Sequence, residues 1–169
     1  MTGIDIGNTA INRNAYSSAG FTVIDLYNPA NADGILDTVQ VWPLFYITGL
    51  RVGTFFLVSG ATYQCRDSEA IGNVPAGYHI FTGLSIAVVA GDYIGCYFSG
   101  GAIECDWPGG VGLPYVGGEH IDPGDQAAYS SQGARTISLY GSWVSVQTKS
   151  RLLVALRTLP SVRELPPVR

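Results

Sequence analysis

The stretch from Val88 to Trp107, VVAGDYIGCYFSGGAIECDW, constrains the fold more than any other part of the chain. Apolar residues alternate with small or polar ones on both sides of Gly100-Gly101, and two glycines suit the positive φ values of a two-residue hairpin turn. The expected hairpin pairs Phe98 with Ile103, Cys96 with Cys105 and Ile94 with Trp107. These six residues share one face, so a shift of one residue in register would expose all of them.

The opposite face of the expected hairpin is polar, because it places Tyr97 opposite Glu104 and Gly95 opposite Asp106. A strand pair with one apolar and one polar face needs a second layer to cover the apolar one. We therefore predict an all-β fold: an antiparallel, jelly-roll-like sandwich of two sheets, followed by an extended C-terminal tail.

Short strand-like runs separated by turn signals fill the rest of the body, as is typical of all-β folds. The expected strands are Phe21 to Tyr27, Ile35 to Trp42, Arg51 to Val58, Ala61 to Arg66, Ile71 to Val74, Tyr78 to Phe81, Leu84 to Val89 and Arg135 to Gln147. Ser59-Gly60 predicts a second hairpin. The segment from Pro108 to Gln126 is rich in Gly and Pro, so over most of its length we expect a loop with functional potential. No amphipathic helix is expected.

The 169 residues suit one domain with a sizeable core, and we place a β-sandwich at residues 1–148 and a tail at 149–169. A charged content of 13% with 47% apolar residues excludes a disordered chain. No apolar run is long enough to span a bilayer, so no membrane partner is expected. The first twenty residues lack the basic start and apolar core of a signal peptide.

Charge divides the chain into two parts. Residues 1–148 hold four arginines and twelve carboxylates, a net charge of −8, whereas residues 149–169 hold five basic residues and one acid, a net charge of +4. An acidic body repels phosphate, so no nucleic-acid partner is expected. An acidic body with a basic tail suits self-association.

The tail repeats every six residues. Arg151, Arg157, Arg163 and Arg169 follow this spacing, each of the first three followed two positions later by Leu153, Leu159 or Leu165, and Leu156 adds to the apolar content. An extended strand or polyproline segment would align the arginines along one side, and the prolines disfavour a helix. Such a segment needs a partner surface to bury its leucines, so we predict that it docks on neighbouring copies. The alternative is a frayed terminus.

Several turn and strand motifs resemble those of a known group. They are a strand ending in Arg66-Asp67-Ser68, the run IGNVPAG, the run AGDYIGCYFSGGAIE, the Tyr115 to Gly118 region with Ile121, and Ile137 to Gly141. Together, over roughly Gly3 to Gly141, they resemble β-sandwich proteins encoded in tailed-phage genomes and environmental sequence collections. Those proteins are taken for virion or fibre components. The shared motifs are structural, so the resemblance implies no catalytic residue and does not cover the tail.

Cys96 and Cys105 would occupy a non-hydrogen-bonded pair of the expected hairpin, where side chains lie closest. A cross-strand disulfide fits that register if the protein resides outside a cell. Alternatively, these two and Cys65 are small buried apolar residues. No CxxC pair or His cluster is present, so we expect neither a metal site nor a cofactor.

Candidate catalytic residues are few. Glu119, His120, Asp122 and Asp125 of the long segment could form a metal site or an acid/base pair, and Ser130 or Ser131 could be a nucleophile. Calcium could be held by Asp122 and Asp125, but an ordinary solvated turn explains the loop residues better. Glu104 and Asp106 could act as a glycosidase pair, yet no opposed carboxylate can be placed. We therefore expect no enzymatic activity.

Two functions from different classes remain. The first is a structural subunit that self-assembles through its tail into a filament, fibre or virion surface. The alternative is a carbohydrate-binding module in which Tyr97, Tyr115 and Tyr140 stack on sugars beside Glu104 and Asp106. Sandwich folds serve both functions, and the tail favours the first. The expected partners are other copies of the chain and, for the alternative, surface glycans.

Overall fold

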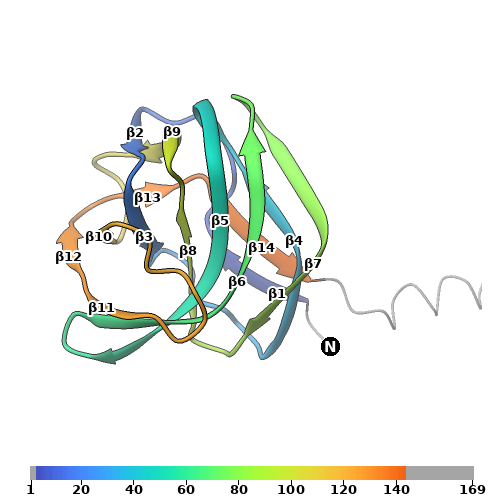
Figure 1. The fold of residues 1–169 in the computed structure, drawn as a ribbon, viewed down its shortest axis with the longest axis vertical. Coiled ribbons are helices and arrows are strands. Elements are labelled where there is room, and N and C mark those ends of the chain that lie inside the picture. Colours follow the sequence, from blue (N-terminus) through green and yellow to red (C-terminus); the bar gives the residue numbers. More distant parts are fainter. Residues whose placement is uncertain (1–2, 144–169) are drawn as a thin grey trace, which may run out of the picture.

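The structure is a computed structural model that describes residues 3–143. Within this range the chain forms fourteen strands and no helix, arranged as two antiparallel sheets (Figure 1). The predicted all-β sandwich is confirmed. The predicted tail and the domain boundary at residue 148 lie outside the described residues. In the described part no helix is long and apolar enough to cross a membrane.

The smaller sheet has four strands in the order β1-β14-β4-β7. Their bounds are Ile4–Gly7 for β1, Leu139–Trp143 for β14, Gly34–Val41 for β4 and His79–Val88 for β7. Leu36, Val39 and Val41 of β4 point into the core, while Thr38 and Gln40 point outward. The alternation is interrupted once, by a register shift between Leu36 and Thr38. The outer face of this sheet is therefore open to solvent.

The larger sheet is organised around β5, a strand of 17 residues. Its main path runs β11 (Gln126–Ala128), β6 (Thr62–Val74), β5 (Pro43–Ser59), β8 (Tyr93–Tyr97), β3 (Phe21–Asp25), β10 (Leu113–Gly117) and β12 (Ser130–Gln132). A branch from the first part of β5 adds β9 (Gly100–Asp106), which also pairs with β2 (Ala15–Ser18) and β13 (Thr136–Ile137). The sheet curls into a half-barrel (Figure 1). The predicted Ser59-Gly60 hairpin is confirmed, since Ser59 pairs with Thr62.

The expected hairpin between β8 and β9 is wrong. Both strands pair with β5 instead: β8 with residues 51–55 and β9 with residues 43–48. Between them the backbone N–H of Ser99 donates to the Thr48 carbonyl at 2.9 Å. Gly101 has φ +92°, and a Cβ there would lie 2.2 Å from the Tyr46 carbonyl oxygen. The glycines therefore allow close approach to β5 rather than a hairpin turn.

The apolar face of this stretch is nevertheless placed correctly. Ile94, Cys96, Phe98, Ile103 and Cys105 all have no exposed surface, although Trp107 is 56% exposed. The cysteines do not face each other: Cys96 pairs with Val23 and Val52, and Cys105 with Ala15 and Ile137. Cys65, Cys96 and Cys105 are free and buried. The expected Cys96–Cys105 register, and with it the cross-strand disulfide, is therefore wrong.

Carboxylate side chains of β6 hydrogen-bond to the backbone of β7 where the two sheets meet. The outer edge of β7 lies beside β6, and the backbone N–H groups of Ala87 and Ser85 donate to Asp67 at 2.7 Å and Glu69 at 3.1 Å. The hydroxyl of Thr54, on β5, donates to the Ala87 carbonyl at 2.6 Å. Side chains thus satisfy backbone groups that a strand would otherwise pair, and the edge of β7 is blocked against strand addition at residues 85–87.

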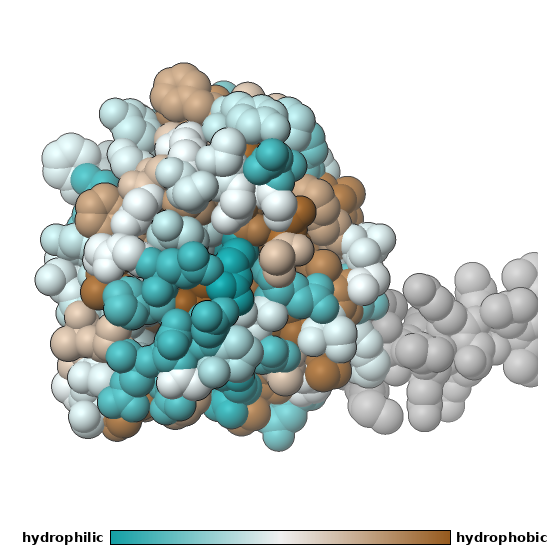
Figure 2. Space-filling model, viewed as in Figure 1, coloured by the Kyte–Doolittle hydropathy of each residue, from teal (hydrophilic) through white to brown (hydrophobic). Residues whose placement is uncertain are grey.

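Two apolar cores result, one on each face of the larger sheet. The main core fills the space between the sheets. The second lies on the outer face and consists of Ile24, Phe55, Tyr63, Cys65, Ile121 and Tyr129. One of these residues, Ile121, comes from the segment that was expected to be a loop, which also contributes β10. That segment therefore covers a core, and Figure 2 shows its hydrophilic side facing solvent over β11 and β6.

Ile121 tests this covering role. We expect Ile121→Ala to lower the free energy of unfolding by about 2–5 kcal/mol, because its side chain is fully buried. The exposed Val111 of the same segment provides the control, and Val111→Ala should change the value by less than about 0.5 kcal/mol. Urea unfolding measures both. Equal stability of the two variants would show that the segment is only a surface loop.

Candidate functional site

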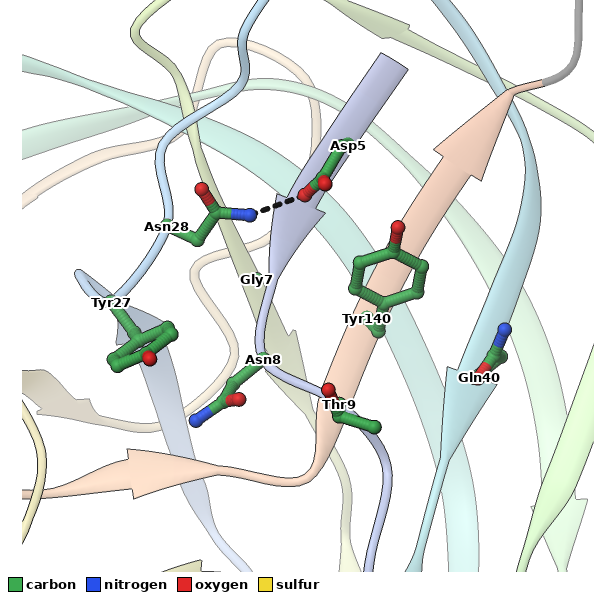
Figure 3. Close-up of a pocket in the computed structure, with 8 residues that line it drawn as sticks. All are labelled: Asp5, Gly7, Asn8, Thr9, Tyr27, Asn28, Gln40 and Tyr140. Carbon is green, nitrogen blue, oxygen red and sulfur yellow. Dashed lines mark hydrogen bonds between the residues drawn. The ribbon is translucent and has the colours of Figure 1, made fainter. Parts of the chain in front are cut away.

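A groove of about 390 Å³ opens on the outer face of the smaller sheet. It is lined by Asp5, Gly7, Asn8, Thr9, Tyr27, Asn28, Gln40 and Tyr140 (Figure 3). Two tyrosine rings, Tyr27 and Tyr140, stand on opposite sides of Gly7, at the end of β1, and of Asn8, which follows the strand. The remaining side chains are polar, and one of them is a carboxylate. The groove thus combines aromatic walls with hydrogen-bonding groups.

Strand pairing sets the right-hand side of the groove in Figure 3. Gly7 pairs with Tyr140, and Tyr140 pairs with Gln40, so these residues form one row across β1, β14 and β4. Residues in one row point to the same face of a sheet. Partial burial, with a smaller contribution from the Asp5 carboxylate, raises the pKa of the Tyr140 hydroxyl. Tyr140 therefore remains a neutral phenol that can donate and accept.

The turn after β3 supplies the other side. Asn28 accepts a backbone hydrogen bond from Gly7 at 2.8 Å, and its side-chain amide donates to the Asp5 carboxylate. These two bonds hold the turn against β1. Tyr27, which is 49% exposed, is presented beside them. The turn was predicted from NPANADG, but its docking against the N-terminal strand was not, because no local signal links them.

Asp25, at the end of β3, lies under the groove with no exposed surface. One of its carboxylate oxygens accepts from the Tyr27 backbone N–H at 2.9 Å. The other accepts from the Thr136 hydroxyl at 2.6 Å and the Ile137 N–H at 2.9 Å. Burial raises the pKa of Asp25, outweighing these hydrogen bonds and the nearby Arg13 charge, which lower it. The buried carboxylate thus fixes the backbone that carries Tyr27.

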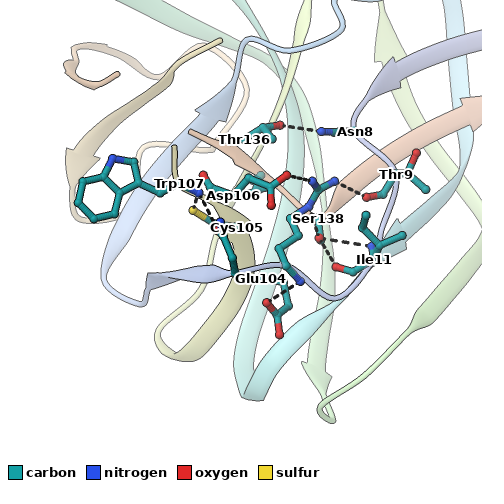
Figure 4. Close-up of polar contacts among 12 residues, drawn as sticks. Asn8, Thr9, Ile11, Glu104, Cys105, Asp106, Trp107, Thr136 and Ser138 are labelled. Carbon is teal, nitrogen blue, oxygen red and sulfur yellow. Dashed lines mark hydrogen bonds and ion pairs between the residues drawn. The ribbon is translucent and has the colours of Figure 1, made fainter. Parts of the chain in front are cut away.

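A buried arginine completes this support (Figure 4). Thr136 accepts a hydrogen bond at 3.1 Å from the side chain of Asn8, which lines the groove. Arg13, only 4% exposed at its side chain, donates to the Thr9 carbonyl and the Ser138 hydroxyl, both at 2.7 Å, and pairs with Asp106. The segment that carries Asn8 and Thr9 is therefore held from below by hydrogen bonds, which fix this side of the groove.

The sugar-binding residues expected from the sequence are not brought together. Glu104 is 3% exposed, and its carboxylate accepts from the Arg13 backbone N–H at 3.1 Å. The prediction that Glu104 lies on a solvent-facing polar surface is therefore wrong. Asp106 is the ion-pair partner of Arg13. Tyr97 and Tyr115 belong to adjacent rows of the larger sheet and point to opposite faces. Of the tyrosines named, Tyr140 lies in the groove.

The acidic residues of the long segment form ion pairs and a turn hydrogen bond within the fold. Arg51 pairs with Glu119 at 2.5 Å and with Asp122 at 2.7 Å. His120 donates its backbone N–H to Thr22 at 2.9 Å, and Asp125 accepts from the Asp122 N–H at 3.1 Å. Within residues 3–143 no three His, Cys, Asp or Glu side chains gather as metal ligands.

Comparisons of the chain with protein-family models, with curated proteins and with solved structures found no match. The resemblance to phage and environmental β-sandwich proteins stays a prediction. Any function must therefore be argued from the residues themselves.

The pKa shift of Asp25 leads to a prediction about pH. A carboxyl group with a raised pKa in the folded state favours folding while it is protonated, and this contribution is lost as the pH rises through the folded-state pKa. The loss begins near the ordinary aspartate value of about 4. We therefore expect the stability advantage of the unaltered protein over Asp25→Asn to be largest below that pH and to shrink above it.

Chemical unfolding of both proteins across a pH series measures this difference. Asp33→Asn, at an exposed carboxylate, is the control. A stability advantage that grows with pH would mean that Asp25 does not have the raised pKa.

Proposed function

We propose that the described domain is a carbohydrate-binding module whose binding site is the groove lined by Tyr27 and Tyr140. The observation that carries this proposal is the pairing of two tyrosine rings with amide, carboxylate and hydroxyl groups in one preformed groove. A sugar ring has an apolar C–H face that packs on aromatic rings, and its hydroxyls both donate and accept hydrogen bonds. The groove volume of 390 Å³ is within the usual range of about 300–1,000 Å³ for ligand sites.

The charge of the groove favours a neutral sugar. Asp5 is its one charged lining residue, and residues 1–148 carry a net charge of −8. A phosphate or carboxylate would be repelled there. Asn8, Asn28 and Gln40 instead offer amides, which bind uncharged hydroxyls in pairs.

Glycan binding is tested with the full chain. A glycan array should identify a neutral oligosaccharide, and isothermal titration calorimetry then gives its affinity. We expect Tyr140→Ala to weaken binding at least tenfold, or about 1.4 kcal/mol, because the aromatic wall is lost. Tyr46→Ala removes a tyrosine that is 53% exposed and lies outside the groove, and it should leave the affinity unchanged. Equal losses in the two variants, or an array without neutral glycans, would contradict the proposal.

A second function is self-assembly into a filament, fibre or virion surface, in which case the groove would face outward on the assembly. The division of charge between body and tail and the six-residue spacing of the arginines support it. The blocked part of the β7 edge reduces the number of sites where a strand can be added, since Asp67 and Glu69 occupy the backbone donors of Ala87 and Ser85. The two functions are compatible, as a fibre subunit can carry a binding site.

Removing residues 149–169 tests assembly. We expect the full chain to form large homo-oligomers and the shortened chain to be a monomer, as measured by size-exclusion chromatography with light scattering. A full-length control with Arg151, Arg157, Arg163 and Arg169 changed to Gln separates the effect of charge from that of the leucines. Identical monomeric masses for the intact and shortened chains would end the assembly proposal.

A further inference from the structure

The row of residues that lines one side of the groove continues across the outer face of the smaller sheet. Tyr140 pairs with Gln40, and Gln40 pairs in turn with Ile80 of the edge strand β7. Residues in one row point to the same face of a sheet, so Ile80, which is more than half exposed, lies on the face that carries the groove. The groove therefore opens onto a surface that reaches β7.

A second pair of aromatic rings stands at the β7 side of this face. Trp42 directly follows β4 and Tyr78 directly precedes β7, and their ring centroids are 6.2 Å apart. Their neighbours Val41 and His79 pair with each other, and Val41 belongs to the core between the sheets. Because successive residues of a strand alternate between faces, Trp42 and Tyr78 lie on the outer face, in the row next to that of Ile80.

The face that joins the two aromatic pairs is polar and almost uncharged. On the other side of the Tyr140 row lies a row that consists of Asp5, Ser142, Thr38 and Thr82. Asp5 is the one charged residue in these two rows, and the other polar groups are hydroxyls and an amide. Such groups both donate to and accept from the hydroxyls of a neutral sugar. An interface with a second copy of the chain would be more apolar.

Tyr140 and Tyr78 are too far apart to contact the same sugar ring. Tyr78 is two strands across from Tyr140 and two residues along, which separates the two backbone positions by about 12 Å. A linked sugar ring extends a glycan by roughly one strand spacing, about 4.8 Å, so about three rings span this distance. A ligand that contacts both aromatic pairs is therefore an oligosaccharide.

We propose that the outer face of the smaller sheet binds a linear, neutral oligosaccharide of about three or more units, which runs from the groove to the Trp42–Tyr78 pair. This inference rests on the proposed function and extends it from one groove to a chain-binding face. Tyr27 and Tyr140 hold one end of the glycan. The Trp42–Tyr78 pair packs on the C–H face of a unit at the other end, and the Gln40 amide contacts the units between.

A length series of glycans tests the proposal with the full chain. The probes are an array of neutral gluco-, xylo-, manno- and galacto-oligosaccharides of two to six units, followed by isothermal titration calorimetry of the series that binds. We expect its six-unit member to bind at least about tenfold more tightly than its two-unit member. Equal affinity at all lengths would overturn this inference and leave the groove proposal standing. An array in which no series binds would contradict both.

Two matched variants locate the added contacts. Tyr78→Ala should weaken the six-unit glycan about tenfold and the two-unit glycan less than about twofold, because only the longer chain reaches Tyr78. Tyr16→Ala is the control: Tyr16 is 51% exposed and Tyr78 46%, and Tyr16 also packs against an aromatic ring, at 6.5 Å from Phe45, but on β2 of the larger sheet. It should change neither affinity. Equal effects of the two variants on the six-unit glycan would refute the proposal.

The indole N–H signal of Trp42 in NMR spectra provides a measurement that needs no substitution. The six-unit glycan should shift this signal more than the two-unit glycan does, while the signal of Trp107, on the larger sheet, stays in place as an internal reference. An unshifted Trp42 signal at saturation would overturn the inference. Light scattering on Tyr78→Ala covers the other occupant: a lower oligomer mass with undiminished six-unit binding would assign this face to a second copy and refute the glycan site.

Discussion

The buried carboxylate of Asp25 is the constraint on which the groove depends. It joins the end of β3, the turn at Tyr27 and strand β13 through three hydrogen bonds, and Thr136 extends the connection to Asn8. An acid without solvent contact is costly to bury, so it persists only where several donors surround it. The hydrogen bonds that offset the cost of burying Asp25 also join segments that are more than a hundred residues apart in the chain.

This support holds in place the half of the groove lining that lies in turns, as the proposed binding function requires. Ordering side chains and loops at the moment of binding reduces affinity, and a preformed site avoids that cost. The Arg13 network acts in the same way, since it holds the Thr9 carbonyl and the Ser138 hydroxyl. The two sheets, in contrast, are joined by apolar packing and by carboxylates along the β6–β7 seam.

The sequence predicts the fold better than it predicts the site. Alternation of apolar residues correctly assigned Cys96 and Ile103 to the core, but it defines a face and not a partner strand, so β8 and β9 were joined to each other instead of to β5. Ile121 was not assigned to the core, because one apolar residue in a Gly-rich segment carries no periodic signal. Tyr140 was named as a sugar platform, yet its neighbours Asn8 and Asn28 come from turns whose meeting depends on long-range pairing.

Native-state hydrogen exchange at the Tyr27 and Ile137 amides tests the role of Asp25 most directly. Both N–H groups donate to this side chain, so their protection reports whether the carboxylate holds the turn and β13 in solution. The account predicts that both amides exchange as slowly as those of the core strands, and that Asp25→Ala accelerates both together. Exchange as fast as that of the exposed Asn12 in the unaltered protein would contradict it.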